Sequence, residues 1–280
     1  MIHRHERESA VPFKFDTYFV AIVPNIKRMK LKLCAFAIIL QFFVYNMASA
    51  QKQFKALIVT TTMGWHHESI HNGVLALQQL ATKNFFDAEV FQDPKSFNDS
   101  FLKKFQVIIF LNTTGDILDA SQQAVMERFI RSGKGFVGIH SASDTEYDWD
   151  WYTKLVGRMF HIHPVIQTAK LQVLDPSFPG LQGFAQGQLW TDEWYQFGEE
   201  KVKDLHYILG VDETSYDPKV VWADKKGEGM GKFHPLAWYH NYDGGRSFYT
   251  ALGHLPTNFD NQAFLNHLYA GILWAATGKK

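Results

Sequence analysis

The chain has 280 residues, of which 46% are hydrophobic and 20% are charged, and its 28 basic residues equal its 28 acidic residues in number. This balance excludes a disordered tail, a collagen-like fibre and a strongly basic nucleic-acid-binding protein. The charge is unevenly distributed, because the first 50 residues hold seven of the basic and three of the acidic residues. Residues 51–280 therefore have 21 basic and 25 acidic side chains, a formal net charge of −4.

The N-terminal segment has the three parts of a secretory signal peptide. Lys30 and Lys32 supply a short positive region, and residues 33–45 form an apolar run interrupted by one glutamine. The small residues 48–50 then fit a cleavage site. An apolar run of 13 residues is shorter than the roughly 20 that a transmembrane helix needs. We therefore predict a signal peptide over residues 29–50.

The mature protein is expected to be periplasmic or secreted, cleaved near Ala50, and to meet the membrane only through its signal peptide. Because a complete signal begins at Met29, we expect residues 1–28 to be an extension from a start codon assigned too early. The single cysteine, Cys34, lies in the leader. Residues 51–280 therefore have neither a disulfide nor a thiol nucleophile, and their stability depends on a buried core.

Apolar strands and amphipathic helices alternate through the first half of this body. Continuous apolar runs predict strands, and apolar residues at helical spacing predict the helices between them. The predicted strands are residues 54–60, 88–91, 106–111 and 136–140, and the predicted helices are residues 70–80 and 119–132, the second capped by Asp119. Apolar strands separated by helices indicate a parallel sheet covered on both faces. We therefore predict an α/β fold with a doubly wound, flavodoxin-like, mostly parallel sheet.

From about residue 165 the pattern changes to short strands and turns. The strands predicted here are residues 169–174, 188–195, 207–211, 220–223, 236–239 and 247–252, and a closing helix is predicted over residues 259–276. No Pro/Gly-rich linker separates the two halves. We therefore expect residues 51–280 to form one domain whose C-terminal half is rich in β-structure.

Histidines and carboxylates follow several of the predicted strands. In open α/β sheets, ligands bind beyond the carboxyl ends of the strands, at the point where the strand order reverses. Histidine and carboxylate side chains there suit proton transfer near neutral pH or metal ligation. The loops after the first, third and fourth strands are residues 60–69, 112–116 and 140–144, and further polar clusters lie at residues 161–164, 192–195, 234–240 and 253–254.

Five motifs in this order resemble the ThuA-like (trehalose utilisation) family over roughly residues 54–278. They are GWHHES at 64–69, GKGFVGIHSASD at 133–144, FHIHP at 160–164, DEWY at 192–195, and PLAWYH at 235–240 followed by GRSFYTALGH at 245–254. The resemblance implies a fold of the class I glutamine amidotransferase-like type, with a sharp turn after the fourth strand that carries the nucleophile. His140 stands where an amidotransferase has its cysteine, so thioester-based glutamine hydrolysis is excluded.

The resemblance also implies a role in carbohydrate utilisation. ThuA-like proteins are associated with sugar oxidoreductases that produce 3-keto-glycosides, so we expect a disaccharide or a 3-keto-glycoside to be processed by hydrolysis or isomerisation. A non-catalytic sugar-binding protein on the same scaffold and a metal-dependent hydrolase of a non-sugar substrate are the alternatives. We expect a small-molecule carbohydrate as partner and no nucleic acid; the sequence is compatible with a homo-oligomer.

Four residues are the candidates for acid–base catalysis. His67 matches the histidine of the family's first motif, and His140 and Asp144 follow the fourth strand; a histidine that bonds loop carbonyls and a helix cap are the alternatives for these two. Glu193 adjoins Asp192, and neighbours on a strand face opposite sides. Glu193 with Asp144 would also form the carboxylate pair of a glycosidase.

Four tryptophans are candidates for stacking on a sugar, namely Trp65, Trp149, Trp151 and Trp194. Packing into the core is the alternative for Trp65 and Trp194. Ser69 is expected to cap the helix that follows it.

A metal site, with zinc as the candidate ion, is the last expectation. His161 and His163 share one face of an extended segment, but only His163 matches the family pattern, and a third ligand is required. We therefore take His163 and His254 as candidate ligands, with Glu193 or Asp144 to complete the set.

Overall fold

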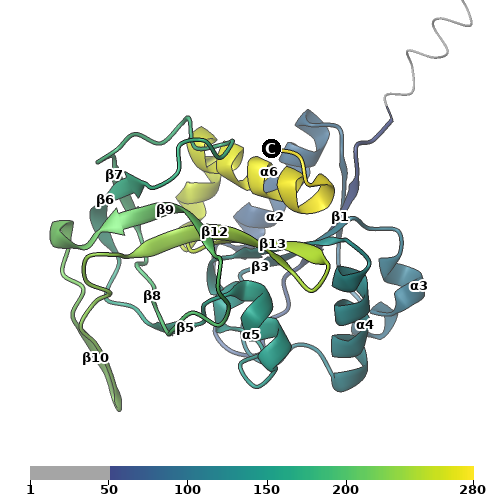
Figure 1. Ribbon diagram of the computed structural model, residues 1–280, viewed down its shortest axis with the longest axis horizontal. Helices are drawn as coiled ribbons and strands as arrows, with labels where there is room; N and C mark the ends of the chain where they lie inside the picture. Colours follow the sequence, from purple (N-terminus) through teal and green to yellow (C-terminus); the bar gives the residue numbers. More distant parts are fainter. Residues whose placement is uncertain (1–50) are drawn as a thin grey trace, which may run out of the picture. The chain divides into compact units, whose positions relative to one another are not determined.

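A nine-stranded mixed sheet runs through residues 51–280, the part of the chain that the computed structural model describes (Figure 1). The predicted signal peptide and extension lie outside the described residues. The strands of this sheet are β1 (Lys55–Val59), β2 (Asp87–Val90), β3 (Val107–Leu111), β4 (Gly135–Ile139), β6 (Gln167–Val173), β7 (Leu189–Asp192), β9 (His206–Asp212), β12 (Pro235–Tyr242) and β13 (Gly245–Thr250). Their spatial order is β2-β1-β3-β4-β13-β12-β9-β6-β7.

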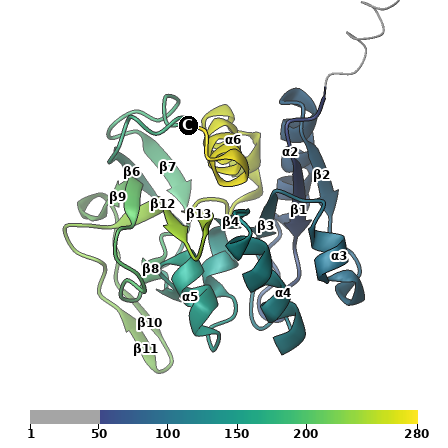
Figure 2. The same ribbon diagram turned by 45° about the vertical axis from the view of Figure 1, so that its right-hand side comes forward.

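The first five strands in this order are parallel to one another. β3 and β4 are buried along their whole length, as their uninterrupted apolar sequences require when helices cover both faces of a sheet. The strand order reverses beside β1, which confirms the predicted doubly wound α/β fold. β13 comes from the C-terminal half of the chain and lies beside β4 as the fifth parallel strand. One sheet therefore contains both halves of the sequence (Figure 2).

The remaining strands, β12, β9, β6 and β7, continue the sheet with antiparallel pairing, which accounts for the β-rich C-terminal half. Two further pairs are β5 (Phe160–Ile162) with β8 (Gln196–Phe197), and β10 (Val220–Trp222) with β11 (Lys225–Gly227). The strand predicted over residues 188–195 is wrong beyond Asp192. There the Asp192 carboxylate accepts the backbone N–H of Glu193, and the chain leaves the sheet.

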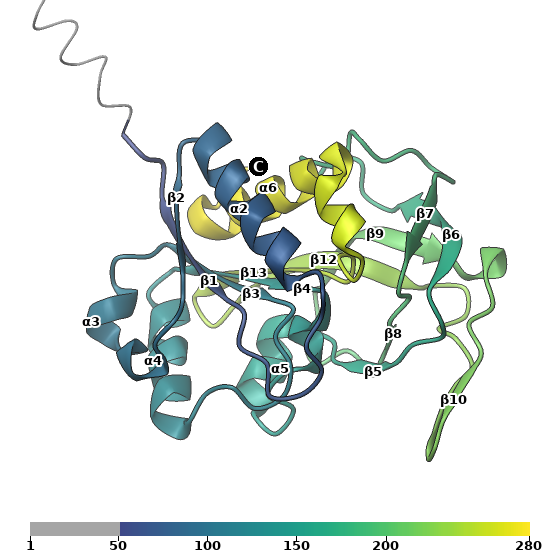
Figure 3. The same ribbon diagram turned by 180° about the vertical axis from the view of Figure 1, so that it is seen from behind.

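Helices cover both faces of the sheet. They are α2 (Ile70–Lys83), α3 (Asp99–Leu102), α4 (Ala120–Arg131), α5 (Asp150–Val156) and α6 (Gln262–Thr277). α2 and α6 lie on one face and α4 and α5 on the other, with α3 beside α4 (Figures 1 and 3). Within residues 51–280, no helix combines the length and the apolarity needed to cross a membrane.

Of the two predicted helix caps, Asp119 is confirmed and Ser69 is not. Asp119 begins α4 in a capping box: its carboxylate accepts backbone N–H groups, and Gln122 accepts the backbone N–H of Asp119. The expectation that Ser69 caps α2 is wrong, because its hydroxyl donates to the Gly253 carbonyl, 3.0 Å away. Ser69 thus links the start of α2 to a loop 184 residues away in the sequence.

The core under α6 contains one buried histidine, His267. Its imidazole packs among the rings of Phe184, Phe248 and Phe264. Neither ring nitrogen has a hydrogen-bond partner within the described part of the chain. Burial in these apolar surroundings lowers the pKa of His267 to about 3, so the ring is neutral in the folded protein at physiological pH.

We expect His267→Leu to raise the free energy of unfolding, because it replaces a buried, unpaired polar ring by an apolar side chain. The gain should grow as the pH falls. Below about pH 6.5 the histidine binds a proton in the unfolded protein, whereas buried His267 stays neutral in the folded protein. The free energy of unfolding of the wild type therefore falls by about 1.4 kcal/mol per pH unit.

Urea unfolding at about pH 7.5 and about pH 5 measures both effects, and the wild type should lose roughly 2 kcal/mol more than the variant between them. His161→Leu, at an exposed position, is the control and should leave the pH dependence unchanged. Equal pH dependence in the wild type and His267→Leu would contradict this account.

Candidate active site

A sharp turn after β4 places His140 at the carboxyl end of the parallel strands. The turn is a 3₁₀ segment, η2 (His140–Asp144), and His140 begins it with φ of +50°, a conformation that is rare for residues other than glycine. Gly138 permits the close packing beneath, because a Cβ there would lie 3.0 Å from the Tyr249 ring and 3.2 Å from Ala142. The turn has the backbone form that the family resemblance implies.

The His140 imidazole is fully buried and is held at both nitrogens. Nδ1 lies 2.7 Å from the Ala251 carbonyl oxygen, which can only accept, so Nδ1 carries a proton. Nε2 lies 2.9 Å from the Tyr195 hydroxyl. Burial raises the Tyr195 pKa well above its usual value, so this hydroxyl stays protonated and can donate to Nε2. Because Nδ1 is bonded to the Ala251 carbonyl, Nε2 is the His140 nitrogen that faces the polar groups of the site.

His67 enters the same cluster from the loop after β1. Its ring meets the rings of His140 and His254 edge-on, with centroids 4.8 and 5.3 Å apart. Its Nδ1 lies 3.3 Å from the hydroxyl of Ser141. Of the two adjacent histidines, His67 is buried whereas His66 is exposed.

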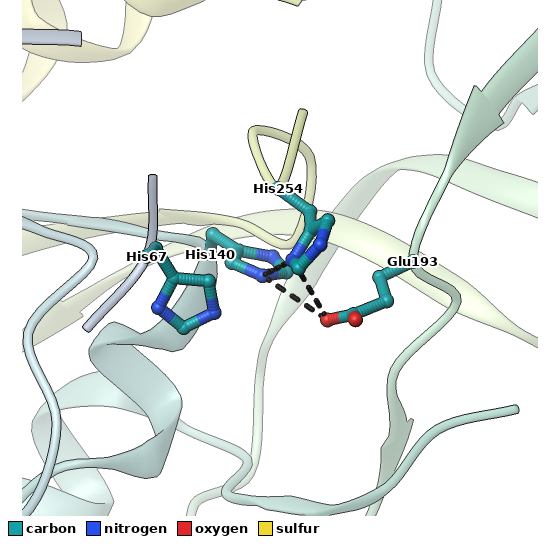
Figure 4. Close-up of side chains that lie close together, drawn as sticks. All are labelled: His67, His140, Glu193 and His254. Atoms are coloured by element: carbon teal, nitrogen blue, oxygen red, sulfur yellow. Dashed lines mark hydrogen bonds and ion pairs between the residues drawn. The ribbon is translucent and has the colours of Figure 1, made fainter. Parts of the chain in front are cut away.

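Glu193 and His254 complete the cluster (Figure 4). One Glu193 oxygen, Oε2, lies 3.0 Å from His254 Nδ1 and 3.5 Å from His140 Nε2. The other, Oε1, lies 3.4 Å from Nε2 of His163. Burial opposes ionisation of Glu193, but the imidazoles of His140 and His254 beside its carboxylate outweigh burial and hold its pKa well below the usual range.

Asp192 fixes the position of His254. Its fully buried carboxylate accepts the backbone N–H groups of Gly253 at 2.9 Å and His254 at 3.1 Å. It also accepts the Asn258 side-chain amide from the 3₁₀ segment η4 (Pro256–Asp260). Gly253 has φ of +117°, a conformation that favours glycine. The two adjacent carboxylates therefore have different roles: Asp192 holds the loop, and Glu193 faces the histidines.

The electrostatics of the cluster follow from burial and from the proximity of its members. Burial, and then the charges of His140 and His254, lower the pKa of His67 to about 2. Burial also lowers the His163 pKa, while the Glu193 carboxylate outweighs burial and raises the pKa of His254. Burial raises the Asp144 pKa. His67 and His163 are therefore neutral at physiological pH.

A pocket of about 430 Å³ opens above the cluster, a size within the range of small-molecule sites. Its floor and walls are formed by Trp65, His67, Asp144, Phe160, His163, Glu193, Tyr195, Trp222 and His254. His140 is absent from this lining and has no exposed surface. It acts on the pocket only through its neighbours, which corrects the expectation that it exchanges protons with a substrate directly.

The aromatic walls differ from the tryptophans expected from the sequence. Trp65 lines the pocket and is 73% exposed. Trp194 is fully buried and donates its N–H to the Gln167 carbonyl, because the strand that would present it to solvent ends at Asp192. Trp149 and Trp151 stack on each other at the start of α5 and donate to Glu127 and Asp243; neither lines the pocket. Trp149, Trp151 and Trp194 therefore pack within the protein and do not form the sugar-stacking surface that the sequence predicted.

Three pocket residues were missed by the sequence analysis. Phe160 and Tyr195 belong to the FHIHP and DEWY motifs, so attention to the aromatic members of these motifs could have found them. Trp222 lies on the β10–β11 hairpin, outside every motif, and no sequence signal places it at the pocket. The side chain of Gln196 clamps both ends of the hairpin: it donates to the Pro218 carbonyl and accepts the Gly229 backbone N–H.

The other polar residues predicted for the site lie partly at the pocket and partly on the surface. Asp144 lines the pocket and accepts a hydrogen bond from Tyr147. The N-cap of α5 is Trp149, without a side-chain hydrogen bond, and the nitrogens of His140 face Ala251 and Tyr195. His161 is exposed. The expected metal pair of His163 and His254 is not the set that converges in the described chain. Instead, one ligand atom from each of His67, His140, Glu193 and His254 lies within 4.8 Å of the others.

Comparison with known proteins identifies the family of this chain. Residues 55–275 match the family model named ThuA and described as trehalose utilisation. The chain belongs to the ThuA family. No curated protein matches it in sequence.

Solved structures share the fold of this ThuA protein. A putative ThuA-like protein from Bacteroides uniformis has 22% identity and a TM-score of 0.68, over 83% of this chain and 95% of its own. One from Parabacteroides merdae has 18% identity and a TM-score of 0.62, over 81% and 91%. A cytoplasmic protein from Salmonella typhimurium has 9% identity and a TM-score of 0.53, over 80% and 99%. At these identities the likeness concerns the fold alone.

We expect Asp192→Asn to destabilise the protein by roughly 2–4 kcal/mol, because an amide cannot accept from all the donors that the buried carboxylate satisfies. Chemical denaturation measures the loss. Asp116→Asn, the same change at an exposed position, is the control and should stay within about 0.5 kcal/mol of the wild type. If Asp192→Asn lowered the stability no more than Asp116→Asn does, Asp192 would not hold the 253–254 loop.

Proposed function

We propose that this ThuA protein is exported and processes a disaccharide or a 3-keto-glycoside, by hydrolysis or isomerisation. The observation that carries the proposal is the pocket itself, in which aromatic walls stand above a floor of imidazole and carboxylate groups. The family's description as trehalose utilisation supports a sugar substrate. The signal-peptide pattern of residues 29–50 supports export.

The walls suit a sugar ring. Trp65 and Trp222 line the pocket from separate segments, and both keep exposed surface, 73% and 38% respectively. Flat aromatic faces bind the apolar C–H faces of sugars, while a few polar groups fix their orientation. Asp144 lies among the lining residues as an acceptor for sugar hydroxyls.

The floor suits proton transfer beside a carbonyl group. In a 3-keto-glycoside the ketone acidifies the C–H bond on the neighbouring carbon. Removal of that proton by a carboxylate or imidazole forms an enolate. The enolate either takes a proton back at another position, which isomerises the sugar, or expels the glycosidic oxygen, which takes a proton from an acid. Water then adds to the C=C bond of the unsaturated keto-sugar that this elimination leaves, and completes the hydrolysis. His67, Glu193 and His254 are the floor groups that face the pocket and can exchange these protons.

Exchange in D₂O provides the test. We expect the protein to replace the proton next to the keto group of 3-keto-trehalose, or of another 3-keto-glycoside, by deuterium, which NMR detects even without net turnover. Glu193→Gln should reduce this rate at least 100-fold. The matched control, Glu68→Gln, makes the same change at an exposed neighbour of His67 and should keep the wild-type rate.

Trp222→Ala should raise KM several-fold with little change in kcat, because the indole contributes to binding and not to proton transfer. Background exchange with every keto-sugar, together with no cleavage of the parent disaccharides, would contradict the enzyme proposal. Saturable sugar binding without any exchange would support a non-catalytic sugar-binding protein on the same scaffold.

A further inference from the structure

We infer that His67, His140, Glu193 and His254 form a binding site for one divalent transition metal of the zinc type. Sugar need not be the substrate for this inference to hold, because it rests on the geometry of four side chains. They come from four separate segments: the loop after β1, the turn after β4, the segment after β7 and the loop after β13. Figure 4 shows the three rings and the carboxylate converging on one point.

The distances between ligand atoms match a tetrahedral ion. Zinc lies roughly 2.0–2.2 Å from nitrogen and oxygen ligands, so neighbouring ligand atoms around it are about 3.4 Å apart. His140 Nε2 lies 3.3 Å from His254 Nδ1 and 3.5 Å from Glu193 Oε2, and His254 Nδ1 lies 3.0 Å from Glu193 Oε2. All four ligand atoms lie within 4.8 Å of one another, so His67 needs only a small movement toward the other three.

The surroundings orient two of the rings as metal ligands require. A ligating histidine typically has its second nitrogen hydrogen-bonded to a carbonyl, carboxylate or hydroxyl group, which fixes the ring and the tautomer. The Ala251 carbonyl does this for His140 at Nδ1, and Ser141 lies 3.3 Å from His67 Nδ1. Nε2 of each ring remains for the metal, once the Tyr195 hydroxyl has turned its proton away from His140.

The donor set indicates the class of ion. Three imidazoles and one carboxylate favour zinc and its first-row neighbours over magnesium or calcium, which prefer oxygen ligands. The site is also open to the pocket, because His67, Glu193 and His254 line it. A bound ion that accepts a fifth ligand from the pocket side would polarise a substrate carbonyl or a water molecule. In the metal-bound protein His67, Glu193 and His254 would hold the ion instead of exchanging protons. Asp144 and His163, which line the pocket outside the ligand set, would then exchange them.

Metal binding can be measured directly on the protein purified without a histidine tag and stripped with a chelator. We expect titration calorimetry to show one Zn²⁺ per chain. Co²⁺ should give visible absorption bands more intense than those of the hydrated ion, and zinc should raise the melting temperature. His254→Asn and Glu193→Gln should weaken the affinity at least tenfold, and Ser141→Ala should weaken it less.

The matched controls are His66→Asn and Glu68→Gln, which make the same changes at exposed residues beside His67 and should bind zinc within about twofold of the wild type. Circular dichroism of each variant separates lost binding from lost folding. Absence of saturable Zn²⁺ binding to the wild type, or equal affinity in folded ligand and control variants, would overturn the metal site. Zinc binding with no exchange on any keto-sugar would instead contradict only the proposed function.

Discussion

A buried carboxylate organises the centre of this protein. Ionised carboxylates are costly to remove from water unless hydrogen bonds replace the lost hydration. Asp192 meets this requirement with the backbone N–H groups of Gly253 and His254 and the amide of Asn258. The same bonds draw the loop after β13, in the parallel part of the sheet, to the end of β7, at the far antiparallel edge. Glu193 and His254 face each other as a consequence.

The parts of the fold that depend on local pattern could be predicted from the sequence. Uninterrupted apolar runs identified β1, β3 and β4, and Asp119 marked the start of α4. The place of β13 could not be predicted, because residues 247–252 have the same apolar pattern whether they pair in parallel with β4 or only with β12. The strand with which β13 pairs depends on contacts between residues more than a hundred positions apart, and the spacing of apolar residues along the chain gives no information about such contacts.

The same distinction explains which site residues could be found. His67, Glu193 and His254 follow strands, and strand ends meet at one edge of the sheet, so their place near the pocket could be anticipated. Trp194 was misplaced because strict alternation was assumed past Asp192, where a side-chain hydrogen bond turns the chain out of the sheet. The role of Ser69 could not be read from its position before a helix, since a carbonyl distant in sequence binds its hydroxyl.

The β10–β11 hairpin has a consequence for how this scaffold diversifies. Among the strands of residues 51–280, β10 and β11 pair only with each other, and one side chain, Gln196, holds both ends of the hairpin. Its tip can therefore change in length or sequence without disturbing the nine-stranded sheet. Because the hairpin carries Trp222, such changes would reshape one wall of the pocket and leave the floor intact. The wall and the floor of the pocket can thus change independently of each other in this protein.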